Sequence, residues 1–202
     1  MKKTLSLVAL MLICSICFIS CGNRNNNSSG NNEGTSHVYS TLNALIQKDY
    51  SKVNISTTVV IDDITLVSEY DVTDNSIYYS VEKMNYLSDN IYEMPEDYKT
   101  TVSGSATISN GQVIKNNEDS VTLPSYAELN GKFDFKESNF TNVNNKQGSF
   151  SANVNNLSNL IGQNVVAFNA NITVEYNDSA ITTLVLTYQT SASKVTTVYS
   201  FN

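Results

Sequence analysis

The sequence is poor in the side chains on which most catalytic and metal sites depend. It contains one histidine, His37, three cysteines and no tryptophan. A serine nucleophile needs a base beside it, and His37 lies at the start of the predicted folded domain, where we expect it to be solvated. We therefore predict a protein that is not an enzyme, with no catalytic residue, no metal ligand and no cofactor.

The three cysteines all lie within the first 21 residues. Cys14 and Cys17 interrupt an apolar run from Leu5 to Ile19, which follows two lysines and contains no acidic residue. A basic start, an apolar middle and a small-residue exit are typical of a secretory signal peptide, and the run is too short to prefer a transmembrane helix. We predict a signal peptide over residues 1–20. The C-x-x-C formed by Cys14 and Cys17 leaves with it, so we expect no disulfide in the mature chain.

The apolar run ends in Phe18-Ile19-Ser20-Cys21, which resembles the lipobox of bacterial lipoproteins. Phe18 departs from the leucine usual at the first position. The resemblance implies that Cys21 is the lipid anchor, linked to diacylglycerol at the mature N-terminus. It implies a location on the extracytoplasmic face of a bacterial membrane, in the cell envelope. The alternative is a plain signal peptide cut nearby, which would leave a secreted protein with one free thiol.

Basic residues are also scarce once the signal peptide is removed. From Cys21 onward ten basic residues face nineteen acidic residues, a formal charge of −9. A negative field of this kind repels polyanions, so nucleic acid is an unfavourable partner. The same charge disfavours binding to anionic lipid headgroups, and the predicted contact with the membrane is the diacylglycerol at Cys21.

Residues 21–36 contain the anchor cysteine and a linker, and one helix follows. The linker reads GNRNNNSSGNNEGTS and has no large apolar residue, so we expect it to be disordered. Thr35 or Ser36 can cap a helix over His37–Tyr50. This helix would place four apolar side chains on one face: Val38, Leu42, Leu45 and Ile46.

From Lys52 onward the apolar residues recur with a period of two, the pattern of half-buried strands. Asn110-Gly111 is a strong hairpin signal, Asp62-Asp63 indicates a tight turn, and Ser88–Asp97 is predicted to be a loop. The stretch Phe140–Gln163 is the least legible, and the spacing of Leu157, Leu160 and Ile161 in it is compatible with one helical turn. The predicted extended segments are 53–61, 64–72, 77–86, 98–108, 112–115, a short piece at 121–123, 132–136, 149–154, 166–176, 184–188 and 195–201.

The number of strands limits the architecture. Ten strands span roughly 48 Å, whereas a helix is only about 10–12 Å wide, so one helix cannot cover a flat sheet. The sheet must curl, close into a barrel or fold into a sandwich. We therefore predict a mainly β (α+β) domain over residues 37–202, in which a curled antiparallel β-meander of about ten strands, a half-barrel, packs on one N-terminal amphipathic helix.

This order of elements, on a chain with a lipobox, resembles the LolA/LppX-like family of lipoprotein carriers. The resemblance implies a half-barrel that wraps helices and holds acyl chains between them. One departure is the single clear helix, where the family has more. The resemblance identifies no ligand-binding residue.

Two functions are compatible with these features. The first is a lipoprotein that binds or carries a lipid or other hydrophobic ligand, since ligand sites are mostly apolar concavities. In that case Phe168, Ile172, Leu184 and Leu186 are still more often core than cavity lining. The second is a surface-displayed interaction or structural module with a filled core and no small ligand.

Clusters of acidic residues provide the remaining candidates for chemistry. The pairs Asp62/Asp63 and Glu118/Asp119 lie on predicted turns, where adjacent acids are usually solvated. Asp71 with Asp74 and Asn75, or the stretch Asn116–Asp119, offers oxygen ligands, but neither follows the spacing of a calcium loop. We therefore predict no metal at these positions.

Overall fold

The computed structural model describes residues 33–62, 64–85, 99–130 and 132–202. Asn32–Asn202 forms one compact unit, and the description below concerns that unit alone. The predicted signal peptide, Cys21, most of the predicted linker and the predicted loop Ser88–Asp97 lie outside the described residues. Among the described residues, no helix has both the length and the hydropathy needed to cross a membrane.

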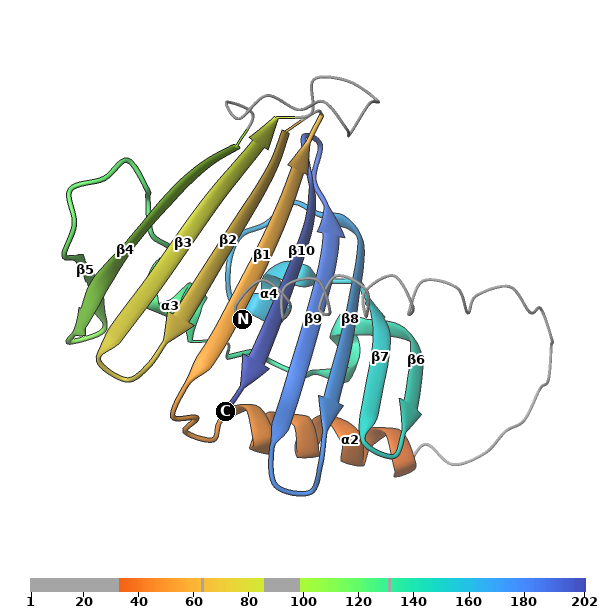
Figure 1. The fold of residues 1–202 in the computed structure, drawn as a ribbon. Helices are drawn as coiled ribbons and strands as arrows, with labels where there is room; N and C mark the ends of the chain where they lie inside the picture. Colours follow the sequence, from red (N-terminus) through yellow and green to blue (C-terminus); the bar gives the residue numbers. More distant parts are fainter. Residues whose placement is uncertain (1–32, 63, 86–98, 131) are drawn as a thin grey trace. The chain divides into compact units, whose positions relative to one another are not determined.

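The described residues contain ten antiparallel strands in a single sheet, shown in Figure 1. The strands are β1 (Val53–Ile61), β2 (Ile64–Val72), β3 (Ser76–Asn85), β4 (Lys99–Ser109), β5 (Gln112–Lys115), β6 (Phe140–Lys146), β7 (Ser149–Val154), β8 (Phe168–Tyr176), β9 (Ile181–Gln189) and β10 (Lys194–Phe201). The predictions of a mainly β fold and of about ten strands are confirmed.

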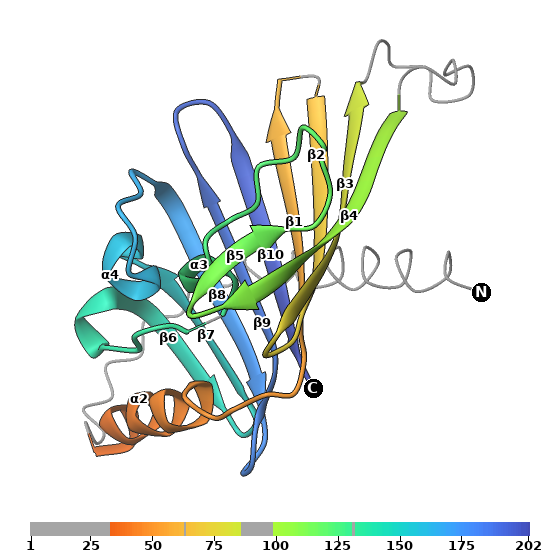
Figure 2. The ribbon, with the colours of Figure 1, turned by 90° about the vertical axis from the view of Figure 1, so that its left-hand side faces the viewer.

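The sheet is built from two five-stranded meanders that meet in its centre. Its strand order is β5-β4-β3-β2-β1-β10-β9-β8-β7-β6, so strands β5 and β6 lie at opposite edges. The central pair consists of the first and the last strand in the chain, β1 and β10. Ile55 lies opposite Tyr199, and Val53 lies opposite Phe201. Figure 2 shows that the sheet curls without closing. The connection between β5 and β6 must therefore pass from one edge of the sheet to the other.

Alternating side chains give the sheet an apolar inner face and a polar outer face. On β1, Val53 and Ile55 are buried, whereas Val60, on the opposite face, is exposed. We call inner face the side that carries Val53, Ile55, Thr57 and Val59 together with their cross-strand partners. Burial of this face provides most of the hydrophobic core.

The helices lie on the inner side of the sheet, as Figure 2 shows. They are α2 (Glu33–Ile46), α3 (Tyr126–Leu129), the 3₁₀ helix η3 (Glu137–Asn139) and α4 (Leu157–Ile161). The predicted apolar face of α2 is confirmed, since Val38, Leu42, Leu45 and Ile46 are all buried. The helical turn predicted at residues 157–161 is confirmed as α4.

The predicted start of the first helix is wrong. Helix α2 begins at Glu33 rather than after Ser36, so the last four residues of the predicted linker are helical. In a helix interior, serine and threonine are less favourable than alanine by only about half a kcal/mol. Thr35 and Ser36 can therefore lie inside the helix as well as cap it. The helix also ends earlier than Tyr50, at Ile46.

Tyr50 fixes the chain between α2 and β1. Its hydroxyl donates a hydrogen bond of 3.0 Å to the Leu45 carbonyl and accepts one of 2.9 Å from the Ile181 amide. Its ring lies 4.8 Å from that of Phe201. Tyr50 therefore connects the end of α2 to both β9 and β10.

A connection of 24 residues links the two edge strands across the inner face. It runs through residues 116–139, and we call it the crossing segment. The predicted strand Lys132–Lys136 lies in it and is not a strand. Phe133 and Phe135 are nevertheless buried, because they point into the core beneath the segment. Their alternation therefore reflects burial without strand pairing. Residues 121–123 also form no strand.

Two hairpin turns predicted from sequence are confirmed. Asn110 and Gly111 have φ angles of 52° and 72°, as a type I′ turn requires at both central positions. Asp62 has a φ of 48°, and Ile61 pairs with Ile64, so the first hairpin has a two-residue turn. These turns set the register of β1 with β2 and of β4 with β5.

Strand β8 differs from its prediction at the N-terminal end. Asn169 has a φ of 51°, and the pairing of β8 with β9 shifts register between Phe168 and Asn171. Phe168 is consequently half exposed, and Val166, which was predicted to be part of the strand, is 87% exposed. Phe168 is therefore not a core residue. A left-handed residue inside an alternating pattern is difficult to predict, because it leaves the pattern of residue types unchanged.

Candidate functional site

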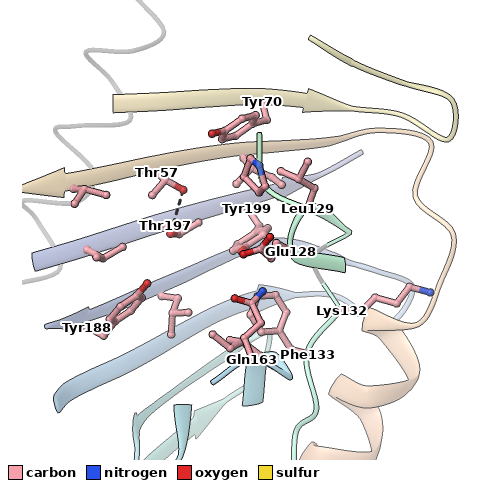
Figure 3. A pocket seen from close by; sticks show the side chains of 16 residues that line it. Thr57, Tyr70, Glu128, Leu129, Lys132, Phe133, Gln163, Tyr188, Thr197 and Tyr199 are labelled. Carbon is pink, nitrogen blue, oxygen red and sulfur yellow. Dashed lines mark hydrogen bonds between the residues drawn. The ribbon is translucent and has the colours of Figure 1, made fainter. Parts of the chain in front are cut away.

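A partly open cavity of about 220 Å³ lies between the inner face and the crossing segment. It sits over the centre of the sheet, where the two meanders meet (Figure 3). The sheet lines it with Ile55, Thr57, Val59, Tyr70, Leu186, Tyr188, Val195, Thr197 and Tyr199. The opposite wall consists of Pro124, Glu128, Leu129, Lys132, Phe133, Ile161 and Gln163. This cavity is the candidate ligand site.

The opposite wall of the cavity is held by hydrogen bonds to backbone atoms. The amide of Asp134 donates to the carbonyl of Leu160, over 2.9 Å, and thereby connects the crossing segment to α4. Buried Asn139 donates from its side chain to the carbonyl of Asp134, over 3.0 Å. These bonds satisfy backbone groups that have no strand partner, and they hold the backbone next to Phe133 over the sheet.

Aliphatic and aromatic side chains form most of the cavity wall, and eight of the sixteen lining residues carry a polar or charged group. Thr57 donates a hydrogen bond of 3.2 Å to Thr197 across the β1–β10 pair. Among the described residues, the hydroxyls of Tyr188 and Tyr199 and the carboxamide of Gln163 have no side-chain hydrogen-bond partner. Apolar walls with a few convergent polar groups are the usual composition of a small-molecule site.

The tyrosines of the cavity are held in their neutral form. Burial raises the pKa of Tyr199 to about 12, and the nearby Tyr188 and Glu128 contribute to the same rise. Burial also raises the pKa of Tyr188. For Tyr70, burial raises the pKa, although a hydrogen bond with Ser68 partly opposes the rise. These three hydroxyls therefore act as neutral hydrogen-bonding groups at neutral pH.

The two charged residues of the cavity wall differ in position. Glu128 lies in α3, and its carboxylate accepts a hydrogen bond of 2.6 Å from the Ser125 amide, which fixes it at the start of that helix. Figure 3 shows Glu128 beside Tyr199, whereas the side chain of Lys132 extends away from the tyrosines. The charge nearest the tyrosine hydroxyls is therefore negative.

A second polar cluster lies under the β3–β5 edge of the sheet. Tyr79, on the inner face, donates a hydrogen bond to the Asp119 carboxylate. Lys115 donates to the same carboxylate, over 2.5 Å, and to the carbonyls of Asp119 and Val121, over 2.9 and 2.7 Å. The bonds from Lys115 and Tyr79 lower the pKa of Asp119 to about 2, and the bond to Asp119 raises the pKa of Tyr79 to about 12. These bonds therefore hold the loop that follows β5 against the inner face of the sheet.

The acidic clusters considered from sequence separate in the structure. Asp119 is not solvated as expected for an acid on a turn, because Lys115 and Tyr79 hold its carboxylate. Asp71 forms an ion pair of 2.9 Å with Lys52, while Asp74 is exposed on a turn. Within the described part of the chain, no group of three His, Cys, Asp or Glu residues could hold a metal ion.

The structure places the other residues named from sequence as follows. His37 is exposed on α2. Ile172 and Leu184 belong to the buried core, and Leu186 lines the cavity. Cys21 lies outside the described residues.

Sequence reasoning did not identify Tyr188, Tyr199 or Gln163. The available signal is that each tyrosine continues the apolar alternation of its own strand, after Leu184 and Leu186 in one case and after Val195 in the other. In the register of β9 with β10, Tyr188 lies opposite Val195 and Tyr199 opposite Leu184, so both side chains face inward with their backbones four positions, about 13 Å, apart along the strands. No motif marks Gln163, which follows α4.

The chain matches no protein-family model and no curated protein.

Proposed function

We propose that the protein is a cell-envelope lipoprotein, non-enzymatic and anchored through Cys21, that binds an apolar or amphipathic ligand in a β half-barrel. The observation that carries this proposal is the cavity between the inner face and the crossing segment. Its walls consist mostly of aliphatic and aromatic side chains, and it lies on one face of a sheet whose other face is polar. In this proposal α2, α4 and the crossing segment form the helical filling of the half-barrel.

The size of the cavity limits what it can enclose. An apolar cavity of about 150 Å³ binds benzene, whereas typical ligand pockets have about 300–1,000 Å³. With about 220 Å³, this cavity encloses a short alkyl end or a single ring rather than two complete acyl chains. The proposed ligand is therefore bound by one end, and the rest of it lies outside the cavity.

Two phenylalanine variants on the same strand test whether the cavity is the binding site. Val195 lines the cavity, whereas Val198 lies on the opposite face of β10. Val195→Phe fills the cavity, and Val198→Phe adds the same side chain outside it. Native mass spectrometry of protein purified from membranes measures bound small molecules. We expect a bound mass with the unchanged protein and with Val198→Phe, and its loss with Val195→Phe.

Folding of the two variants is compared by circular dichroism, because overpacking a core costs about 1–3 kcal/mol. A clean ligand-free mass for the unchanged protein, together with no uptake of 1-octanol, would contradict the binding function. Retention of the bound mass by a folded Val195→Phe variant would place the ligand elsewhere.

A surface-displayed interaction or structural module is the second candidate function. It is favoured by the cavity volume, which lies below the usual range of ligand pockets. The outer face would be its working surface, with serine, threonine and asparagine along the central strands, as on β1. The ligand-free mass described above is the result that supports this function.

The anchor is tested separately from the ligand. Cys21→Ala removes the thiol that would carry diacylglycerol, so we expect release of the protein into the medium. Cys17→Ala is the matched control, since Cys17 lies in the predicted signal peptide, and this variant should stay in the membrane fraction. Retention of Cys21→Ala in that fraction would contradict the lipoprotein assignment.

A further inference from the structure

The polar groups of the cavity indicate what kind of amphiphile it takes. Tyr188 and Tyr199 come from neighbouring strands, and Gln163 follows α4 on the opposite wall. Among the described residues their side chains donate no hydrogen bond to protein, and Figure 3 shows all three among the side chains that line the cavity. They offer phenol donors and one carboxamide that both donates and accepts. A ligand oxygen beside them would gain hydrogen bonds that the protein does not supply.

The charge at this point of the cavity disfavours an anion. Glu128 is fixed beside Tyr199 by its bond to the Ser125 amide. The ammonium of Lys132 points away from the tyrosines, so no cation of the described lining residues faces them. Removing a charge from water without a partner is strongly unfavourable, and a carboxylate here would also be repelled by Glu128. The formal charge of −9 from Cys21 onward acts in the same direction.

We propose that the cavity selects an uncharged amphiphile, whose apolar end enters the cavity and whose hydroxyl or ester oxygens bond to Tyr188, Tyr199 or Gln163. Alcohols and acylglycerols belong to this class, and free fatty acid anions do not. The inference rests on the proposed binding function, and it adds the polarity and charge of the ligand.

Two probes with the same alkyl chain test the selection. Isothermal titration calorimetry at neutral pH compares 1-octanoylglycerol with octanoate on the purified full chain. We expect tighter binding of the acylglycerol. Equal or tighter binding of octanoate overturns this inference and leaves the binding function in place. Failure of both probes to bind overturns the binding function, and this inference with it.

Variants that remove one hydroxyl test the donors. Tyr188→Phe and Tyr199→Phe keep the ring, and each should weaken binding of 1-octanoylglycerol by about threefold to tenfold, the effect of one hydrogen bond. Tyr78→Phe is the matched control, because Tyr78 is 62% exposed on the outer face. Equal affinities of all three variants would overturn the assigned contacts.

Glu128→Gln tests the role of charge. Glutamine can accept the same bond from the Ser125 amide, so α3 keeps its cap while the negative charge is removed. We expect octanoate to bind about two- to fivefold more tightly, the effect of one exposed charge, and 1-octanoylglycerol to bind as before. A gain for both probes, or for neither, would overturn the part assigned to Glu128.

Discussion

The side chain of Asn43 replaces a strand partner for the backbone of Phe135. Its amide nitrogen donates to the Phe135 carbonyl over 2.8 Å, and its amide oxygen accepts from the Phe135 amide over 2.9 Å. One side chain on α2 thus satisfies both backbone groups of a buried residue 92 positions later in the chain. This pair of bonds connects the helix to the crossing segment, which forms one wall of the cavity.

Asn43→Ala should therefore destabilise the fold strongly. It leaves both backbone groups of Phe135 unpaired, and each unsatisfied buried group costs about 1–3 kcal/mol. We expect the free energy of unfolding to fall by about 2–4 kcal/mol, measured by urea denaturation. Asn153→Ala is the control, because Asn153 bonds to the Asn171 side chain at the surface. Equal losses in the two variants would show that the Asn43 bonds are not structural.

The same pair of residues explains one limit of sequence analysis. Phe133 and Phe135 alternate with polar residues as in a strand, and both are buried as the alternation predicts. The backbone partners, however, are the Asn43 side chain and the carbonyl of Leu160, which accepts from Asp134. Periodicity reports which side chains are buried, and it carries no information about the partner of the backbone.

The strands themselves could be predicted, whereas their order could not. Local alternation and turn residues such as Asn110 and Gly111 define each hairpin from neighbouring positions. The central pairing of β1 with β10 joins residues such as Ile55 and Tyr199, 144 positions apart, and no local pattern specifies it. Because the cavity lies over this pairing, its lining could not be assembled from the sequence.

Gly104 leaves room for the Tyr79 ring and is the next site to test. The two residues lie opposite each other on β4 and β3, and a Cβ at position 104 would lie 2.3 Å from the Tyr79 hydroxyl oxygen. Gly104→Ala should therefore displace Tyr79 and lower the free energy of unfolding by about 1–3 kcal/mol, the usual cost of overpacking. Urea denaturation measures this loss.

Ser103→Ala is the control for Gly104→Ala, since Ser103 lies on the same strand with an exposed side chain. A second comparison uses Tyr79→Leu, which removes the ring that the added methyl group meets. Combined with Tyr79→Leu, Gly104→Ala should cost less than it does alone. A loss of the same size in both backgrounds would mean that Tyr79 is not the residue displaced.

Asp119 should make stability depend on pH at the acid end. Its folded-state pKa is lowered from 3.8 to about 2 by the bonds from Lys115 and Tyr79, so the folded protein binds a proton less readily than the unfolded chain. The stabilisation is therefore complete above pH 3.8 and is lost as the pH falls to about 2. Asp119→Asn removes this group, so its urea midpoint should fall less than that of the unchanged protein over this interval.

Tyr79 should give the opposite dependence at the alkaline end through the same contact. Its pKa is raised from 10.0 to about 12, so its contribution is present below pH 10 and is lost as the pH rises through 12. Because the bond to Asp119 is the largest cause of this rise, Asp119→Asn should also weaken the alkaline dependence. Asp178→Asn, at an exposed position on the β8–β9 turn, is the control and should keep both dependences. With Asp119→Asn, the pH dependence of the urea midpoint should therefore weaken at both acid and alkaline pH. Weakening at only one of the two would show that the Tyr79–Asp119 bond does not couple the two groups.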